Sequence, residues 1–334
     1  MNPPVIFCHY GNSEYLRYTL QCARLNNPGK EIVLLGDPTN RTIAKHCGVR
    51  HVSFEDFNDI DEIKVFDSVY RLVQGKLHNT MRDGRDWVNF VFRRWFFIYG
   101  FIVRNNAKGF WHFDSDNMIV EDLSTHESKF SAYDCTEQCD GSCMNGYISG
   151  PAVVKNYIDK INSLFQRADF LREQQREFDV SHPEFAFTEM RAYEIYREEN
   201  QIRSIKLATV IDGSTFDDCI CLENGMTMEG TRFGKRIKKI YLAPGGFFLC
   251  ERKDTCDTVQ MNSLNLSWVP LYLFQLVLDH SYRRGCVSSQ TGPFTGRTLA
   301  VAPVPFEFKV RYWIDLVDSY LRGLLQYKTR HLEQ

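Results

Sequence analysis

Short apolar runs alternate with helix-like segments along residues 5–54, and this alternation constrains the fold more than any other feature of the sequence. The runs at 5–8, 31–37 and 49–54 have the length and composition of buried strands. The segments between them, 13–27 and 39–47, have helical character, and Leu16, Leu20 and Ala23 share one helical face in the first. Strands that alternate with helices predict an α/β protein with a mostly parallel sheet flanked by helices.

Polar residues follow the strands at the point where each one ends. The stretches are "HYGNS" at 9–13, "GDPTN" at 36–40 and "DSDN" at 114–117. In an open parallel sheet, ligands bind beyond the carboxyl ends of the strands. The sequence therefore predicts that these three stretches converge on one binding edge.

Two aspartates stand one residue apart at the end of the apolar run "GFWHFDSDNMIV". Asp114 and Asp116 repel each other unless water or a cation neutralises them, and hard divalent ions such as Mg²⁺ and Mn²⁺ prefer oxygen ligands. A solvated acidic turn is the alternative interpretation.

The segment "DWVNFVFRRWFFIYGFIV" at 86–103 is apolar on nearly every side, which is typical of a buried helix. Three polar residues interrupt this apolar segment. Asn89 and Arg93 are four positions apart and share one helical face, whereas Arg94 points about 100° away from Arg93. A buried arginine needs an anionic partner. That partner is either a structural aspartate such as Asp114 or a diphosphate held jointly with a metal.

The loop "HYGNSEY" lies between the first strand and the first helix. A helix N-terminus favours anions, Gly11 permits a tight turn, and the Tyr10 ring offers a surface for a base or sugar. The chain has neither the G-x-G-x-x-G dinucleotide fingerprint at this loop nor a P-loop motif. After the second strand, Asp37 either binds a base or ribose or caps the helix that begins near Thr39.

Further elements are expected along the rest of the chain. Strands are expected near 131–134 and 146–150, and helices over 151–170 and 186–199 with a polar segment at 172–185 between them; further strand-like runs lie at 204–211, 238–243 and 246–251. We therefore expect an α/β domain at 1–262. Amphipathic patterns at 268–280 and 308–327 predict a C-terminal helical appendage at 263–334, whose aromatic residues are expected to pack or to form a homodimer surface.

Composition narrows the classes of protein. The net charge of −2 gives no reason to expect nucleic acid as a partner. The N-terminal residues lack a secretory pattern, and the longest apolar run is far shorter than the roughly 20 residues of a membrane span. Eleven scattered cysteines are typical of reduced thiols. We therefore expect a soluble cytoplasmic protein.

Seven motifs, taken in order, resemble the nucleotide-sugar-dependent glycosyltransferases of the GT-A fold over about residues 5–265. They are "VIFCHYGNSEYLRYTL", "VLLGDPTN", "FRRWFFIYGF", "FWHFDSDNMIV", "NGYISG", "FTEMRAY" and "VIDGSTFDD". The resemblance implies a GT-A-like Rossmann-type fold, a nucleoside-diphosphate sugar donor (a UDP-sugar by resemblance alone), a hydroxyl acceptor such as a glycan, and Mn²⁺ or Mg²⁺ as cofactor.

The resemblance also implies roles for individual residues. The Asp-X-Asp motif, Asp114 and Asp116, would bind the metal, and Glu189 would be the general base of an inverting enzyme, although it is equally explained as an acid in the first turn of a helix. Relatives place a metal-ligating histidine where this chain has Asn265, a weaker ligand. The residues implied in donor binding are His9, Tyr10, Gly11, Asn12, Asp37, Arg94 with Arg93 as a second candidate, Ser115, Asn145 and Gly146.

The sequence thus favours a metal-assisted glycosyltransferase. A non-catalytic sugar-nucleotide or glycan binder is the first alternative. A magnesium-dependent phosphatase like the haloacid dehalogenases is less favoured, because that family places its acidic pair after the first strand and a Thr or Val where this chain has Met118.

Overall fold

The computed structural model describes residues 2–78, 81–82, 85–284, 296–304 and 308. A seven-stranded sheet forms its centre, with the strand order β10-β8-β9-β6-β1-β2-β3. In this sheet β9 runs antiparallel to its neighbours β6 and β8, and the other strands run parallel to one another. The strands are β1 (Val5–His9), β2 (Ile32–Gly36), β3 (Arg50–Ser53), β6 (Phe110–Phe113), β8 (Cys135–Gln138), β9 (Cys143–Ile148) and β10 (Ser204–Lys206). The predicted mostly parallel α/β sheet is confirmed.

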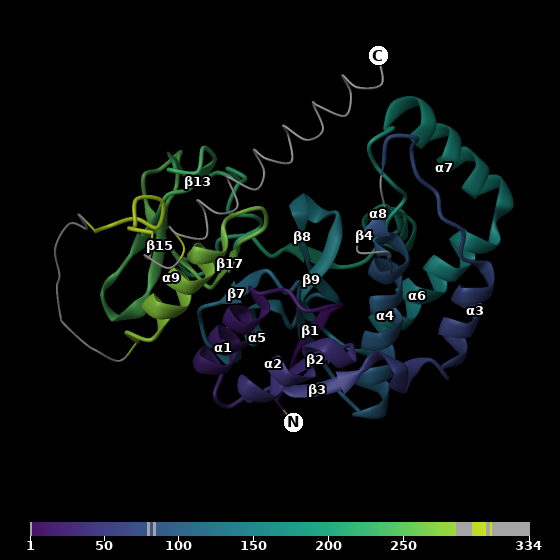
Figure 1. Cartoon of the computed structure of the whole chain (residues 1–334), viewed down its shortest axis with the longest axis horizontal. Helices are drawn as coiled ribbons and strands as arrows, with labels where there is room; N and C mark the ends of the chain where they lie inside the picture. Colours follow the sequence, from purple (N-terminus) through teal and green to yellow (C-terminus); the bar gives the residue numbers. More distant parts are fainter. Residues whose placement is uncertain (1, 79–80, 83–84, 285–295, 305–307, 309–334) are drawn as a thin grey trace, which may run out of the picture.

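Helices cover both faces of this sheet (Figure 1). They are α1 (Leu16–Asn26), α2 (Arg41–His46), α3 (Asp61–Val69), α4 (Trp87–Arg104), α5 (Glu127–Phe130), α6 (Pro151–Gln166), α7 (Ala168–Ser181), α8 (Glu189–Asn200) and α9 (Leu271–Ser281). In β1, Ile6 and Cys8 pack with residues of α3, α4 and α6, whereas Val5 and Phe7 pack with residues of α1. Successive side chains of the strand point to opposite faces of the sheet, and helices cover both faces. This explains why the sequence of β1 is apolar at nearly every position.

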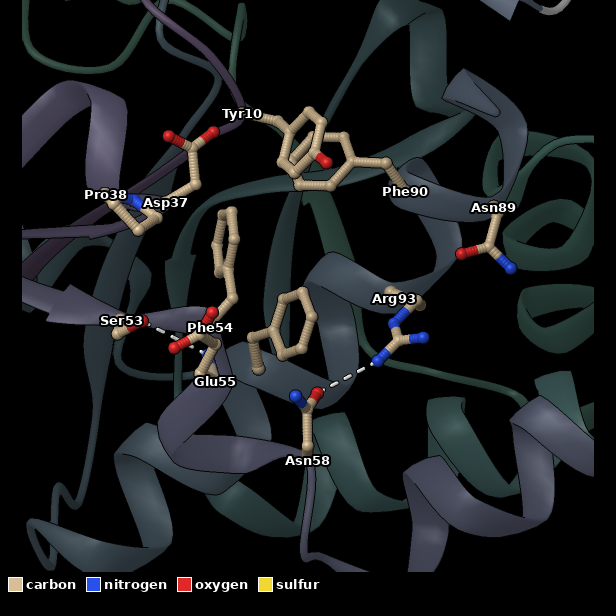
Figure 2. A pocket seen from close by; sticks show the side chains of 11 residues that line it. Tyr10, Asp37, Pro38, Ser53, Phe54, Glu55, Asn58, Asn89, Phe90 and Arg93 are labelled. Atoms are coloured by element: carbon tan, nitrogen blue, oxygen red, sulfur yellow. Dashed lines mark hydrogen bonds between the residues drawn. The ribbon is translucent and has the colours of Figure 1, made fainter. Parts of the chain in front are cut away.

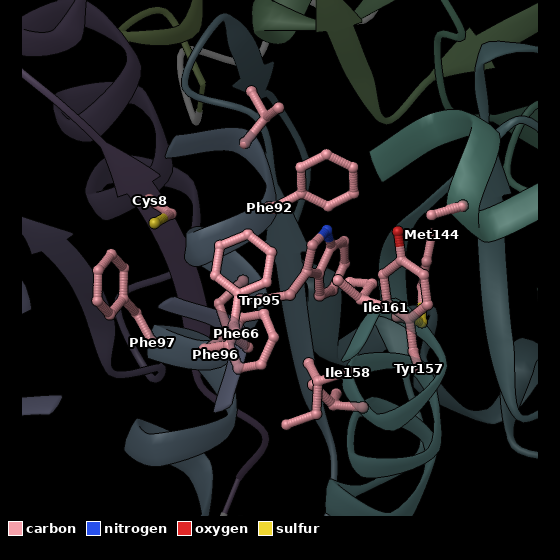
Figure 3. Close-up of a cluster of buried hydrophobic side chains, with 14 of the residues drawn as sticks. Cys8, Phe66, Phe92, Trp95, Phe96, Phe97, Met144, Tyr157, Ile158 and Ile161 are labelled. Atoms are coloured by element: carbon pink, nitrogen blue, oxygen red, sulfur yellow. The ribbon is translucent and has the colours of Figure 1, made fainter. Parts of the chain in front are cut away.

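The larger core cluster is built from aromatic side chains of α4 and its neighbours (Figure 3). The Phe92 ring lies 5.0 Å from Phe165 of α6, and the Trp95 ring lies 5.4 Å from Tyr157. The apolar sequence of α4 therefore reflects contacts on several sides, as predicted for a buried helix.

A smaller β region flanks the central sheet, at the left of Figure 1. Its four-stranded sheet has the order β11-β16-β15-β14, and two-stranded sheets join β12 to β13 and β7 to β17. A separate pair, β4 with β5, directly precedes α4 and lies beside it, on the other side of Figure 1. The strands are β4 (Met81–Arg82), β5 (Arg85–Asp86), β7 (Asn117–Ile119), β11 (Ser214–Thr215), β12 (Met228–Gly230), β13 (Arg236–Lys238), β14 (Ile240–Leu242), β15 (Phe248–Glu251), β16 (Thr258–Met261) and β17 (Ser263–Asn265). Pairing of β7 with β17 brings the chain just after the Asp-X-Asp motif beside residue 265.

The helix expected over 268–280 is confirmed as α9, and its Phe274 ring lies 5.1 Å from Tyr15, just before α1. Apart from Phe308, the helix expected over 308–327 lies outside the described residues. The division into 1–262 and 263–334 stays a prediction. Within the described ranges, no helix is long and apolar enough to cross a membrane.

Several expected elements differ from the structure. The strand expected at 204–211 is limited to β10, and the helix expected over 151–170 is interrupted at Arg167, between α6 and α7. The strand expected at 131–134 begins only at Cys135, because the preceding residues form a turn in which the Tyr133 N–H donates to the Phe130 carbonyl. The polar segment expected at 172–185 is largely helical, since α7 extends to Ser181. Its buried residues Phe170, Gln174 and Phe178 recur every four positions and bury one face of that helix.

Candidate functional site

The ends of β1, β2 and β6 lie side by side, as predicted, and hydrogen bonds join their polar loops. His9 Nδ1 lies 2.8 Å from Ser115 Oγ, which connects the end of β1 to the Asp-X-Asp motif. The Gly11 N–H donates to Asp37 Oδ2 at 2.5 Å, which connects the loop after β1 to the end of β2. Gly11 has φ of 85°, a conformation that favours glycine. Burial lowers the pKa of His9 to about 4, so the imidazole is neutral at pH 7.

A buried asparagine that sequence reasoning did not single out holds these two loops together. Asn40 Nδ2 donates to the main-chain carbonyls of His9 at 2.9 Å and Gly11 at 3.1 Å. Its Oδ1 lies 2.8 Å from Nε2 of His51, on β3. A Cβ at Gly36 would lie 2.2 Å from Asn40 Oδ1, so the end of β2 requires glycine for this contact. The motif "GDPTN" contains Asn40, but no local pattern identifies its distant partners.

Aromatic rings line a pocket of about 490 Å³ beside these loops (Figure 2). The Tyr10 ring lies 5.3 Å from Phe90, and Phe54 stacks on Phe97 at 4.6 Å. The pocket is lined by Tyr10, Asp37, Pro38, Ser53, Phe54, Glu55, Asn58, Asn89, Phe90, Arg93 and Phe97. Its size and its mixture of rings and polar groups are typical of small-molecule sites.

Asp37 acts as a cap in this structure. Its Oδ1 accepts a hydrogen bond from the Thr39 N–H at 2.7 Å, at the start of the short helix Pro38–Asn40. Its other oxygen accepts from Gly11. The predicted capping role is therefore confirmed, and contact with a nucleoside stays a prediction. Asn12 is exposed in the same loop.

The two adjacent arginines of α4 point to different sites, as their helical spacing predicts. Arg93 donates to Asp67 Oδ1 and Asn58 Oδ1, both at 3.0 Å, and lines the aromatic pocket together with Asn89. Arg94 instead is buried beside the Asp-X-Asp motif.

Arg94 forms ion pairs with two candidate residues. One guanidinium nitrogen donates to Asp114 Oδ1 at 2.5 Å, and the other donates to Glu189 Oε1 at 2.8 Å. Burial disfavours the charge, but the two carboxylates outweigh it and raise the pKa of Arg94. The Arg94–Asp114 ion pair, expected as one alternative, is thus present, and Arg94 also pairs with a second acid, Glu189.

Glu189 is the first residue of α8, and its side chain is 7% exposed. Burial raises the pKa of Glu189, while the charge of Arg94 opposes that rise. The expected position in a first helical turn is confirmed. A role as general base stays a prediction, since it requires an acceptor hydroxyl within hydrogen-bond reach of this carboxylate.

The two acids of the motif differ in environment. The Asp114 side chain is 34% exposed and accepts from Arg94, whereas Asp116 Oδ2 accepts a hydrogen bond from Ser267 Oγ at 2.7 Å. Burial, together with the charge of Asp114, raises the pKa of Asp116 to about 6. The pair is therefore not a fully solvated turn. A divalent cation would relieve the repulsion that raises this pKa, so the donor set fits Mg²⁺ or Mn²⁺.

Asn265 is linked to Asp116 through Ser267. Asn265 Oδ1 accepts from the Ser267 N–H at 3.0 Å, and its Nδ2 donates to the Asp218 carbonyl at 3.0 Å. Both ends of the carboxamide therefore have protein partners. Among the described residues, no cluster of three or more His, Cys, Asp or Glu side chains could hold a metal ion. Two carboxylates are nevertheless a common protein contribution where substrate phosphates complete the shell of Mg²⁺.

Asn145 and Gly146 lie on β9, next to β6. Asn145 is buried, and its Oδ1 accepts from the Gly146 N–H at 3.0 Å. Gly146 has φ of 89°, and a Cβ there would lie 2.3 Å from Thr136 Oγ1. The position thus requires glycine for local packing, whatever binds nearby.

No family model matches the chain, and no curated protein matches it. Solved structures do match at low similarity. A cytidylyltransferase from Leptospira borgpetersenii serovar Hardjo-bovis is 10% identical over 62% of this chain and 75% of the other, with a TM-score of 0.33. The PaToxG glycosyltransferase is 10% identical over 60% and 70%, with a TM-score of 0.31.

The glycosyltransferase GlyE of Streptococcus pneumoniae TIGR4 is 14% identical over 62% of this chain, with a TM-score of 0.30. The match spans 46% of that protein. Likeness at this level carries no argument about activity. The α/β fold class follows instead from the strand order and pairing of the central sheet.

Proposed function

We propose that this chain is a glycosyltransferase that moves a sugar, such as a hexosyl group, from a nucleoside-diphosphate sugar to an acceptor hydroxyl with the help of a divalent metal. One observation carries the proposal. Three neighbouring parallel strands end in a hydrogen-bonded set of loops that contains the Asp-X-Asp acids, and an aromatic pocket lies beside it. The pocket is lined by Tyr10 and Asp37 of these loops, and the same loops are hydrogen-bonded to the acidic motif through Ser115. This arrangement suits a ligand with a base at one end and a diphosphate at the other.

The aromatic pocket is the proposed site of the nucleoside. Tyr10 and Phe90 offer ring surfaces for stacking with a base. Asp37, Asn89 and Arg93 supply polar groups around the same space. We propose uridine as the nucleoside, on the sequence resemblance alone.

Asp114 and Asp116 are the proposed metal ligands, and Asn265 is a weaker third candidate. Bound Mn²⁺ or Mg²⁺ would stabilise the negative charge that develops on a departing diphosphate. Arg94 lies against Asp114 and would add positive charge at the same place. Ser267 would keep Asp116 in position, because its hydroxyl donates to the Asp116 carboxylate. His9 would keep Ser115 in position through the hydrogen bond between Nδ1 and Oγ.

Glu189 is the proposed general base. Its burial raises the pKa of the carboxyl, which makes a bound proton more stable than in water. Arg94 donates to Oε1 only, so Oε2 of the same carboxylate is the oxygen proposed to accept the proton of the acceptor hydroxyl.

A non-catalytic sugar-nucleotide binder is the second candidate function. It is favoured by the same pair of contacts, because Arg94 occupies both the proposed metal ligand Asp114 and the proposed base Glu189. The phosphatase alternative has no such support, since the acidic pair follows β6 rather than β1.

Incubation with UDP-, GDP- and dTDP-sugars, with and without Mn²⁺, separates these functions. We expect one nucleoside family to raise the melting temperature in a metal-dependent manner and its sugar to be slowly hydrolysed. Stabilisation without hydrolysis or transfer would favour the binder. Release of phosphate from simple monoesters would favour the phosphatase.

A further inference from the structure

Three buried side-chain amides connect β9 to the Asp-X-Asp motif. Asn145 Nδ2 donates to Gln138 Oε1 at 2.7 Å, and Gln138 Nε2 donates to Asn117 Oδ1 at 3.0 Å. Asn117 Nδ2 lies 3.4 Å from both Asp116 Oδ1 and the Asp114 carbonyl. All three amides are at most 2% exposed, so water cannot replace these partners.

Main-chain groups determine which way each amide points. The Gly146 N–H can only donate, so the atom of Asn145 that faces it is Oδ1. The Asp217 carbonyl can only accept, so the atom of Gln138 that lies 2.7 Å from it is Nε2. The Asp114 carbonyl orients the Asn117 amide in the same way. The hydrogen bonds therefore run in one direction, from Gly146 to the Asp116 carboxylate.

Gln138 is the point at which this chain of amides branches. The two hydrogens on its Nε2 go to Asn117 and to the Asp217 carbonyl. Asp217 in turn accepts from the Asn265 N–H at 3.0 Å and pairs with buried Lys238 at 2.6 Å. The Gln138 side chain, at the end of β8, thus bonds directly to Asn145 of β9. Through Asn117 it is connected to the acidic pair, and through Asp217 to Asn265.

We propose that Gln138 is a positioning residue, which holds Asn145, a residue implied in donor binding, in one orientation and, through Asn117, holds the Asp116 carboxylate in place for the metal. The inference rests on the proposed function. Residue 138 must accept a hydrogen bond from Asn145 and also donate to Asn117 and to the Asp217 carbonyl. Neither an apolar side chain nor a shorter amide at this position can do all three. Loss of a residue that hydrogen-bonds a metal ligand, as Asn117 does, typically lowers metal affinity by about 10- to 100-fold, and Gln138 holds that residue in place.

The test compares Gln138→Met with Gln174→Met, a buried glutamine of α7 whose Nε2 donates to Glu177. We expect Gln138→Met to weaken Mn²⁺ binding by about 10-fold or more, while the control binds as the unmodified protein does. Selective asparagine labelling gives a second measurement that needs no ligand. The side-chain amide protons of Asn117 and Asn145 should exchange faster in Gln138→Met and not in the control.

A double-mutant cycle distinguishes positioning from a general loss of stability. If Gln138 acts on the metal site through Asn117, then Gln138→Met should cause no further loss of Mn²⁺ affinity in an Asn117→Ala background. Additive losses, or unchanged amide exchange at Asn117 and Asn145, would overturn the proposal. If Gln138→Met does not fold, Gln138→Asn keeps a polar side chain and is expected to show the same exchange pattern.

These outcomes are separable from the proposed function. If the unmodified protein binds neither Mn²⁺ nor nucleoside diphosphates, the proposed function fails, and amide exchange still decides whether Gln138 orients Asn117 and Asn145. If the unmodified protein binds Mn²⁺ and Gln138→Met binds it equally well, the positioning role alone fails.

Discussion

One guanidinium nitrogen of Arg94 lies 2.8 Å from Oε1 of Glu189, and both side chains are buried. The two residues are 95 positions apart in the sequence. Their pairing joins the middle of α4 to the first residue of α8 and leaves neither charge isolated in the interior.

Replacement of Arg94 by Met is expected to lower the free energy of unfolding by about 3–5 kcal/mol, because Glu189 would lose its buried partner. Arg104→Met is the matched control, since Arg104 lies on the same helix and pairs with Asp59 at the surface. The control should lose no more than about 1 kcal/mol. Urea unfolding of the two variants measures both values, and equal losses would contradict the buried-pair assignment.

Much of this site could be predicted from the periodicity of short segments of the sequence. The convergence of the loops after β1, β2 and β6 follows from strands that alternate with helices, and the separation of Arg93 from Arg94 follows from the turn of a helix. Each inference needs only the residues of one segment and the geometry of its element.

The remaining contacts depend on pairs of residues far apart in the chain. Ser267 bonds to Asp116 across 151 positions, and Gln138 reaches Asp217 across 79. Serine and glutamine carry no local signal for such partners, since both are common at the surface. The helix α7 was also not predicted, because many polar residues obscure the buried positions Phe170, Gln174 and Phe178.

Tyr10→Ala is expected to weaken binding of a nucleoside diphosphate by about five-fold, the equivalent of about 1 kcal/mol of lost stacking. Tyr10 is partly exposed, so the variant should keep its stability. Phe185→Ala is the control, because Phe185 is exposed and does not line the pocket. Titration calorimetry with UDP, GDP and dTDP measures the change. Equal affinities for Tyr10→Ala and the unmodified protein would place the nucleoside elsewhere.

Stability is expected to fall as the pH drops from about 6.5 to about 4. Burial, assisted by the charge of Arg94, lowers the pKa of His112 to about 4. In the unfolded chain the ordinary value is about 6.5, so the unfolded state binds more protons across this window, and acid favours unfolding. Nδ1 of His112 donates to the Ile6 carbonyl, and no described group pairs with its Nε2, which would carry the added proton.

His112→Asn tests this dependence, because the asparagine Nδ2 can replace Nδ1 as donor to the Ile6 carbonyl. Removal of one such histidine should reduce the slope of unfolding free energy against pH by up to about 1.4 kcal/mol per pH unit within the window. His46→Asn is the control, since His46 is exposed. An unchanged slope in His112→Asn would show that this histidine does not govern the acid sensitivity.

The acidic pair gives the last prediction. Asp116→Asn keeps the shape of the side chain and removes one charge from the proposed metal site. We expect the variant to fold, to bind nucleoside diphosphate without enhancement by Mn²⁺, and to lose turnover. Asp169→Asn, at an exposed position on α7, is the matched control and should behave as the unmodified protein.

The most direct test of the glycosyltransferase proposal is the rate at which nucleoside diphosphate is released from a UDP-sugar as Mn²⁺ is added, in the unmodified protein and in Asp116→Asn. We predict release that rises with Mn²⁺ and saturates in the unmodified protein, and no Mn²⁺-dependent release in the variant. Equal release by both proteins, or none by either with UDP-, GDP- and dTDP-sugars, would contradict the proposal.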